Sequence, residues 1–138
     1  MNIDKFKNEH ETILASVAEL KGLVRSGIPE NAFAIAKAIV DMSAAIKMHL
    51  ASEDRFLYPM LAQSATLSVV RLGQKYQDDM GGIAFAYAEF ASKWNTGPRV
   101  KSSPEEFRLD ANTIFKALHN RIQQENLELY PLFEQGVV

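Results

Sequence analysis

The stretch "HLASEDRFLYPML", residues 49–61, decides the fold because it places two ionisable side chains within a mainly apolar segment. His49 and Glu53 are four residues apart, a spacing that puts both side chains on one face of an α-helix. The same face carries apolar residues expected to pack in a core, and burying an unpaired charge there is costly. The stretch therefore predicts a helix whose buried face carries a polar site with partners on other helices.

A second stretch repeats this ending. "QQENLELYPLF", residues 123–133, also contains Leu-Tyr-Pro, and aligning the two triplets gives an offset of 131 − 59 = 72 residues. The repeat predicts a duplicated helical hairpin whose second copy kept the carboxylate but not the histidines. The equivalent pairs are Glu53 with Glu125, His49 with Arg121 and, at an offset near 70, His10 with Met80.

Four segments carry apolar residues at alternating spacings of three and four, the pattern of helices that bury one face. The four stripes run over residues 3–24, 35–60, 69–94 and 107–132. No segment alternates with period two for long enough to indicate a strand. The sequence therefore predicts an all-α fold, an antiparallel up-down-up-down four-helix bundle formed by one domain over residues 1–138.

Several local expectations follow from this assignment. The inward stripe of the second helix is expected to continue from Glu53 through Phe56 and Met60, with Pro59 kinking or ending the helix. Gly81-Gly82 lies inside the third helix and is attributed to close approach of a neighbouring helix. At the start of the fourth helix, Ser103 and Glu106 are expected to form a capping box. Tyr58 and Tyr130 are expected to close one end with their hydroxyls in water, although one of them could reach the polar core.

Composition excludes several classes of function. The 138 residues include no cysteine, so disulfides and thiolate metal sites are excluded and any metal must have nitrogen and oxygen ligands. A net charge of −2 gives no basic surface for nucleic acid, and no apolar run is long enough to span a membrane. The polar N-terminus is unlike a signal peptide, so the expected location is cytoplasmic. There is neither a phosphate-binding glycine loop nor a nucleophile paired with a base, and we expect no enzymatic activity.

The polar residues on the stripes define a candidate site. In an antiparallel bundle these positions meet at one level of the core, where two histidines and a carboxylate are enough for one iron ion. The alternative interpretation is a set of core histidines that are hydrogen-bonded internally, without a metal. The residues expected to converge are His10, His49, Glu53 and Glu125.

These residues resemble the hemerythrin-like, or HHE cation-binding, family over essentially the whole chain. The matching pieces are Glu9-His10 with Ile13, then His49 and Glu53 with Tyr58-Pro59, and finally Glu125 with Tyr130-Pro131. The resemblance implies a four-helix bundle with a non-haem iron pair, held by histidines from all four helices and carboxylates from the second and fourth. It also implies binding or sensing of a small ligand such as dioxygen or nitric oxide, or of iron itself; the protein partner is unknown.

The ligand set is incomplete relative to that family. Met80 stands where the third helix should carry a histidine, and Arg121 where the fourth should. A thioether is a poor ligand for hard ferric iron, and a guanidinium cannot ligate because it stays protonated. His119 is a weaker substitute because it precedes the matching position by two residues, about 200° around a helix. One bound iron is chemically feasible where two are not supported.

Two interpretations of Arg121 stay open. Its guanidinium could turn inward and neutralise Glu53 and Glu125, replacing the lost cation and leaving a metal-free bundle that acts as a protein-interaction or regulatory module. Alternatively, Arg121 could lie at the surface in an ion pair with Glu125 worth less than about 1 kcal/mol. The function is accordingly either a diminished iron site or its metal-free descendant.

Overall fold

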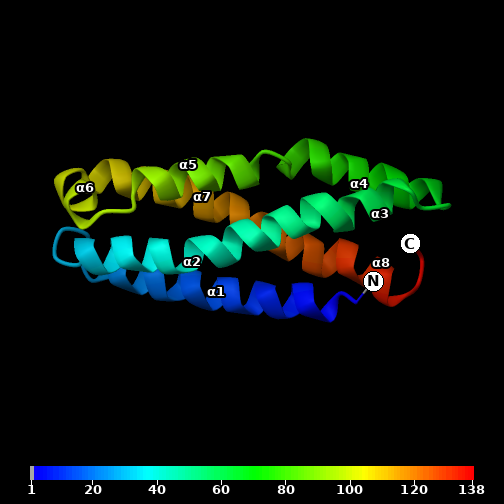
Figure 1. Ribbon diagram of the computed structural model, residues 1–138, viewed down its shortest axis with the longest axis horizontal. Helices are drawn as coiled ribbons and strands as arrows, with labels where there is room; N and C mark the ends of the chain where they lie inside the picture. The colour runs from blue at the N-terminus through cyan, green and yellow to red at the C-terminus, as the bar shows by residue number, and fades with distance from the viewer. Residues whose placement is uncertain (1) are drawn as a thin grey trace.

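The computed structural model describes residues 2–138, and within that range it contains helices and connections but no strand (Figure 1). The prediction of an all-α protein is confirmed. No helix within the described range combines the length and apolar character needed to cross a bilayer. The helical elements are α1 (Asp4–Arg25), α2 (Ala32–Ser52), η1 (Glu53–Leu57), α3 (Tyr58–Ala62), α4 (Leu67–Met80), α5 (Ile83–Lys93), α6 (Gly97–Ser102), α7 (Pro104–Gln124), η2 (Glu125–Leu129) and α8 (Tyr130–Glu134).

Several elements join end to end into longer rods. η1 and α3 continue α2, while η2 and α8 continue α7, and α4 leads into α5 through a short break. Figure 1 shows these rods lying along the long axis of the molecule, with α1 and α2 side by side and the short α6 at the end opposite the two termini. The order of colours along each rod shows that α2 returns antiparallel to α1.

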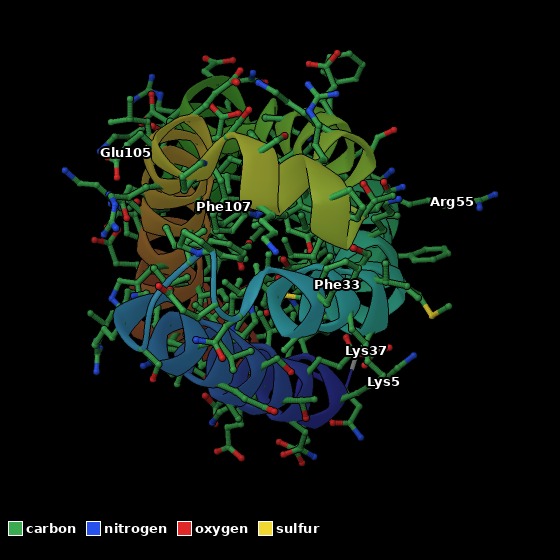
Figure 2. All side chains as sticks on the ribbon, turned by 90° about the vertical axis from the view of Figure 1, so that its left-hand side faces the viewer. Lys5, Phe33, Lys37, Arg55, Glu105 and Phe107 are labelled. Carbon is green, nitrogen blue, oxygen red and sulfur yellow. The ribbon has the colours of Figure 1, made fainter. Side chains whose placement is uncertain are left out.

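The core is divided into an aromatic part and a polar part. Near α6, Trp94 and Phe107 are fully buried with their ring centroids 5.3 Å apart, and Phe90 lies 6.1 Å from Phe107. Figure 2 looks at the molecule from this end and shows Phe107 among the helices, whereas Glu105 and Arg55 extend outward. Among residues 2–138, the buried polar or charged side chains lie on α1 and on the α2–η1 and α7–η2 rods: His10, His49, Glu53, Arg121 and Glu125.

Two segments of π-helix follow the two buried glutamates and correct the predicted stripe. η1 begins at Glu53 and η2 at Glu125, so the two are offset by the same 72 residues as the sequence repeat. A π segment contains one residue more than the α-helix needs, which shifts the inward face by one position. Phe56 is consequently 53% exposed, and Leu57 takes the buried position instead. The helix does not end at Pro59 but continues to Ala62.

Two further local expectations are wrong. The chain breaks at Gly81-Gly82 into α4 and α5, and neither glycine accommodates a neighbouring helix. A Cβ on Gly81 would meet only the carbonyl oxygen of Gln77, at 2.5 Å, and nothing lies within 4 Å of one on Gly82. Ser103 does precede the first residue of α7, but its side chain makes no capping hydrogen bond. Pro104 at the first helical position needs no donor partner, so the helix can start without the capping box.

Candidate metal centre

Four side chains from three rods converge in the polar part of the core. His10 comes from α1, His49 and Glu53 from the α2–η1 rod, and Glu125 from the α7–η2 rod. One nitrogen or oxygen atom from each lies within 4.8 Å of those of the other three, and all four side chains are at most 1% exposed. Nitrogen and carboxylate oxygen at this separation form a donor set that can hold one metal ion.

The orientation of His49 is fixed from outside the cluster. Its Nδ1 lies 2.7 Å from Oε1 of Glu9, a carboxylate that can only accept, so Nδ1–H donates and Nε2 carries the free electron pair. That Nε2 faces Oε1 of Glu53 at 3.1 Å, and it has no hydrogen-bond partner among residues 2–138. Burial opposes protonation of His49, but the adjoining carboxylates of Glu53 and Glu9 and the negative charge of Glu125 outweigh it and raise its pKa. The side chain is therefore positioned to take up a cation.

His10 follows the same arrangement. Its Nδ1 lies 2.7 Å from Oδ1 of Asn126, so the ring donates outward and presents Nε2 to the cluster. Nε2 lies 3.2 Å from Oε1 of Glu125 and 3.9 Å from Oε2 of Glu53. An outer acceptor that fixes the ring through one nitrogen and frees the other is the usual setting of a metal-ligating histidine.

The two carboxylates of the cluster differ in their affinity for protons. Burial and the negative charge of Glu125 raise the pKa of Glu53. Burial acts in the same direction on Glu125, but contact with His10 and the charge of Arg121 outweigh it and lower the pKa of Glu125. Oε1 of Glu125 has no hydrogen-bond partner within the described residues. Glu125 thus keeps its charge and has an oxygen available for a cation, while Glu53 takes a proton more easily.

Both tyrosines of the repeated triplets are buried, so the expectation that their hydroxyls lie in water is wrong. The hydroxyl of Tyr58 donates to Oε2 of Glu125 at 2.7 Å, and that of Tyr130 donates to Oε2 of Glu53 at 2.5 Å. Tyr130 Oη also lies 3.0 Å from Nε2 of His10, and its single proton cannot serve both neighbours. Burial and the two carboxylates raise the pKa of both phenols, which therefore stay protonated donors in the metal-free protein.

Arg121 lies inside the cluster, which excludes its placement at the surface. Its side chain is 1% exposed, with Nε 3.2 Å from Oε2 of Glu125 and Nη2 3.5 Å from Oε1 of Glu53. Nη2 also contacts Oδ1 of Asp54 at 2.8 Å, and the guanidinium lies 5.4 Å from the centroid of the Tyr58 ring. The surrounding carboxylates raise the pKa of Arg121 against the effect of burial, so it stays charged. One cation is thus built permanently into the site.

The remaining candidates do not join the cluster. Met80 is buried, and its backbone carbonyl lies 3.5 Å from Nη1 of Arg121. His119 is exposed on α7 and lies beside a surface groove instead.

The sequence analysis did not identify three residues that support the site, Glu9, Asp54 and Asn126. Glu9 neighbours His10 on α1, yet it fixes His49 on the adjacent helix. Its side chain is 31% exposed and lines a surface cleft of about 560 Å³ between α1 and α2. Helical spacing describes one helix at a time and does not show such cross-helix contacts. The sequence repeat could have indicated Asp54, which pairs with Arg121. Its equivalent in the repeat is Asn126, whose Oδ1 accepts a hydrogen bond from His10.

The fold and this cluster define a class of protein, an all-helical domain with a buried histidine–carboxylate site. The family is established by a match of residues 1–133 to the hemerythrin HHE cation binding domain, and the chain belongs to that family. No significant match links it to a curated protein or to a solved structure.

The residues present fit one metal ion. The free Nε2 of His49 and the free Oε1 of Glu125 are buried donors that a single cation would satisfy together. Two histidines and two carboxylates suit a divalent or trivalent ion of the iron type. A second ion would find no histidine on α4 or α5, and the positive charge of Arg121 would repel it.

Proposed function

We propose that this chain is a hemerythrin-like domain that binds a single non-haem iron ion through His10, His49, Glu53 and Glu125. The observation that carries the proposal is the pair of unpartnered, inward-facing atoms, Nε2 of His49 and Oε1 of Glu125. The outer hydrogen bonds from Glu9 and Asn126 support it, because they select the histidine tautomers that can ligate. We further propose that the helices form an antiparallel up-down-up-down four-helix bundle. We propose that this bundle arose by duplication of a helical hairpin.

Bound iron would supply a redox-active centre with coordination positions open to a small diatomic molecule such as dioxygen or nitric oxide. The side chains of the protein bind the ion, donate a hydrogen bond and balance its charge. The two histidines and two glutamates hold the ion, while the phenol of Tyr130 can donate a hydrogen bond next to it. Arg121 offsets one of the two carboxylate charges, and the buried setting excludes water. Sensing or carriage suits this site better than catalysis, and we propose a cytoplasmic, non-enzymatic role.

A second candidate function rests on Arg121. Its guanidinium contacts both glutamates of the cluster and could serve as their only cation, so that the domain acts as a metal-free interaction or regulatory module. Protons on His49 and Glu53 would then complete the charge balance, in line with the raised pKa of each. The two candidates differ in one measurable property, the metal content.

The test is metal analysis by plasma mass spectrometry, with the visible absorption spectrum, on protein produced with iron and purified without chelators. We expect one iron per chain in the parent protein, loss of iron in His49→Ala and retention in His119→Ala. His119→Ala is the matched control because that histidine is exposed and outside the cluster. A change of the spectrum on anaerobic addition of nitric oxide would support ligand binding. Protein that stays free of iron after anaerobic ferrous reconstitution would overturn the proposal in favour of the metal-free module.

A further inference from the structure

A surface groove of about 540 Å³ lies between α1 and α7. It is lined by residues from 20–25 of α1 and from 108–119 of α7. Its floor is apolar, formed by the buried side chains of Leu20, Ala111 and Phe115 with Val24 at one edge. The volume falls within the range of small-molecule pockets, which combine an apolar surface with a few placed polar groups. The groove is separate from the polar cluster because none of its lining residues belongs to that cluster.

The rim of the groove is basic. Lys21 and Arg25 come from α1, Arg108 and Lys116 from α7, and His119 lies beside them. Four of the chain's 15 lysines and arginines thus surround one groove in a protein whose net charge is −2. No aspartate or glutamate lines it among the described residues. Like charges gathered around a concave surface focus a positive potential and favour an anion.

Two acidic residues of the same helices, Glu19 and Asp110, face away from the groove. Glu19 of α1 lines a different cleft together with residues of α2, and Asp110 of α7 is bound by Lys93 and by the indole N–H of Trp94. Only Arg108 of the rim makes an ion pair within residues 2–138, an exposed contact of 3.5 Å with Glu105. An exposed pair of this kind holds the side chain weakly. The rim cations therefore remain available to an incoming anion.

We propose that this groove binds an amphiphilic organic carboxylate, a small molecule with an apolar body and one anionic head. An inorganic anion would use the rim and leave the apolar surface of the groove uncovered. A neutral apolar molecule would cover the floor and leave the rim charges without counter-ions. Only a ligand with both parts uses both surfaces, since apolar burial and charge pairing each add to its affinity. This inference does not depend on whether iron is bound.

The test uses decanoate below its micelle concentration, with decan-1-ol and acetate as matched probes, followed by calorimetry and by amide chemical shifts in NMR. We expect decanoate to bind more tightly than either probe and to shift amides of α1 and α7 around the groove. The double variant Lys21→Gln/Lys116→Gln should weaken decanoate binding about tenfold or more, as loss of two charge contacts implies. Asn112→Trp, at an exposed lining position, should block the groove without entering the core.

Lys47→Gln is the control, because Lys47 is an exposed lysine of α2 outside the groove. It should leave the affinity unchanged, and circular dichroism should show native helix in every variant. Equal binding of decanoate and decan-1-ol, or an affinity indifferent to Lys21→Gln/Lys116→Gln, would overturn the proposal. So would shifts centred on exposed apolar residues of α2 such as Phe33 and Met48. If decanoate does not bind but an acidic amphipathic peptide does, the proposal is overturned and the ligand of the groove is a protein partner.

Discussion

Arg121 and Glu125 form a buried ion pair one helical turn apart, with Nε of the guanidinium 3.2 Å from Oε2 of the carboxylate. Glu125 faces two different kinds of cation site, one with each of its carboxylate oxygens. Its Oε2 pairs with Arg121, and its Oε1 turns toward His10, 3.2 Å from Nε2. The carboxylate thus divides the polar core into a half already neutralised by the protein and a half suited to a metal ion.

Replacing Arg121 with methionine should destabilise the metal-free protein by about 3–5 kcal/mol. The reason is that Glu53 and Glu125 would be left as buried charges without their counter-ion. Urea unfolding of protein treated with a chelator measures the change, with the exposed Arg71→Met as control. We also expect added ferrous iron to restore more stability to Arg121→Met than to the parent. A cost under about 1 kcal/mol would show that Arg121 contributes no more than a surface pair.

Tyr130→Phe should cost about 1–3 kcal/mol in the metal-free protein. The substitution removes the donor to Oε2 of Glu53 and leaves that buried oxygen unsatisfied. Tyr87→Phe is the comparison, because the equally buried Tyr87 makes only a 3.3 Å contact with Ser43. Thermal unfolding should therefore separate the two variants. Equal midpoints for both would contradict a role for the Tyr130 hydroxyl in the cluster.

Glu9→Ala should lower the affinity for iron by about 10–100-fold without removing a ligand. Glu9 fixes the tautomer and orientation of His49 through the 2.7 Å contact with Nδ1, and outer partners of metal ligands typically have effects of this size. Competition with a chromogenic chelator gives the affinity. The neighbouring exposed Glu11→Ala serves as control and should bind as the parent does. If the two variants bind iron equally, Glu9 does not position His49.

The metal-free protein should lose stability as the pH rises above about 6.5. The pKa of His49 is raised above 6.5 in the folded state, so folding favours its protonated form. The resulting stabilisation is complete below 6.5 and is lost as the pH rises through the folded pKa. The raised pKa of Glu53 acts in the same direction from 4.5 upward, whereas the lowered pKa of Glu125 matters only at still lower pH.

Urea midpoints across this pH range measure the effect in chelator-treated protein. Glu53→Gln removes the strongest partner of protonated His49 and should flatten the dependence. His119→Ala should leave the dependence as it is in the parent. Stability that increases steadily over the same range would show that His49 is not protonated preferentially in the folded state.

The sequence was sufficient for the helices but not for the exact inward face. Alternating spacings of three and four predicted an all-α protein, and the family match agrees with the resemblance carried by His49 and Glu53. Phe56 was misplaced because helical periodicity assumes a regular α-helix, and a π segment breaks that assumption. The sequence repeat could have corrected the placement of Phe56. Phe56 corresponds to Glu128, which is exposed, whereas Leu57 corresponds to Leu129, which is buried.

The polar site was less predictable than the helices because its contacts join different rods. The convergence of His10, His49, Glu53 and Glu125 followed from their shared level on the inward stripes. The buried hydroxyls of Tyr58 and Tyr130 did not follow, since the added residue of each π segment is what turns them inward. Glu9 depends on how α1 and α2 pack together, and a spacing rule within one helix carries no information about that.

The matching π segments bear on the proposed duplication of the helical hairpin. Each copy of the repeat carries its extra residue immediately after the buried glutamate, at Glu53–Leu57 and Glu125–Leu129. A single insertion that preceded the copying of the ancestral segment explains both with one event rather than two. On the proposed duplication, Met80 and Arg121 interrupt only one copy and would be changes that followed the insertion. The guanidinium would then have entered a core whose tyrosines and carboxylates were already in place.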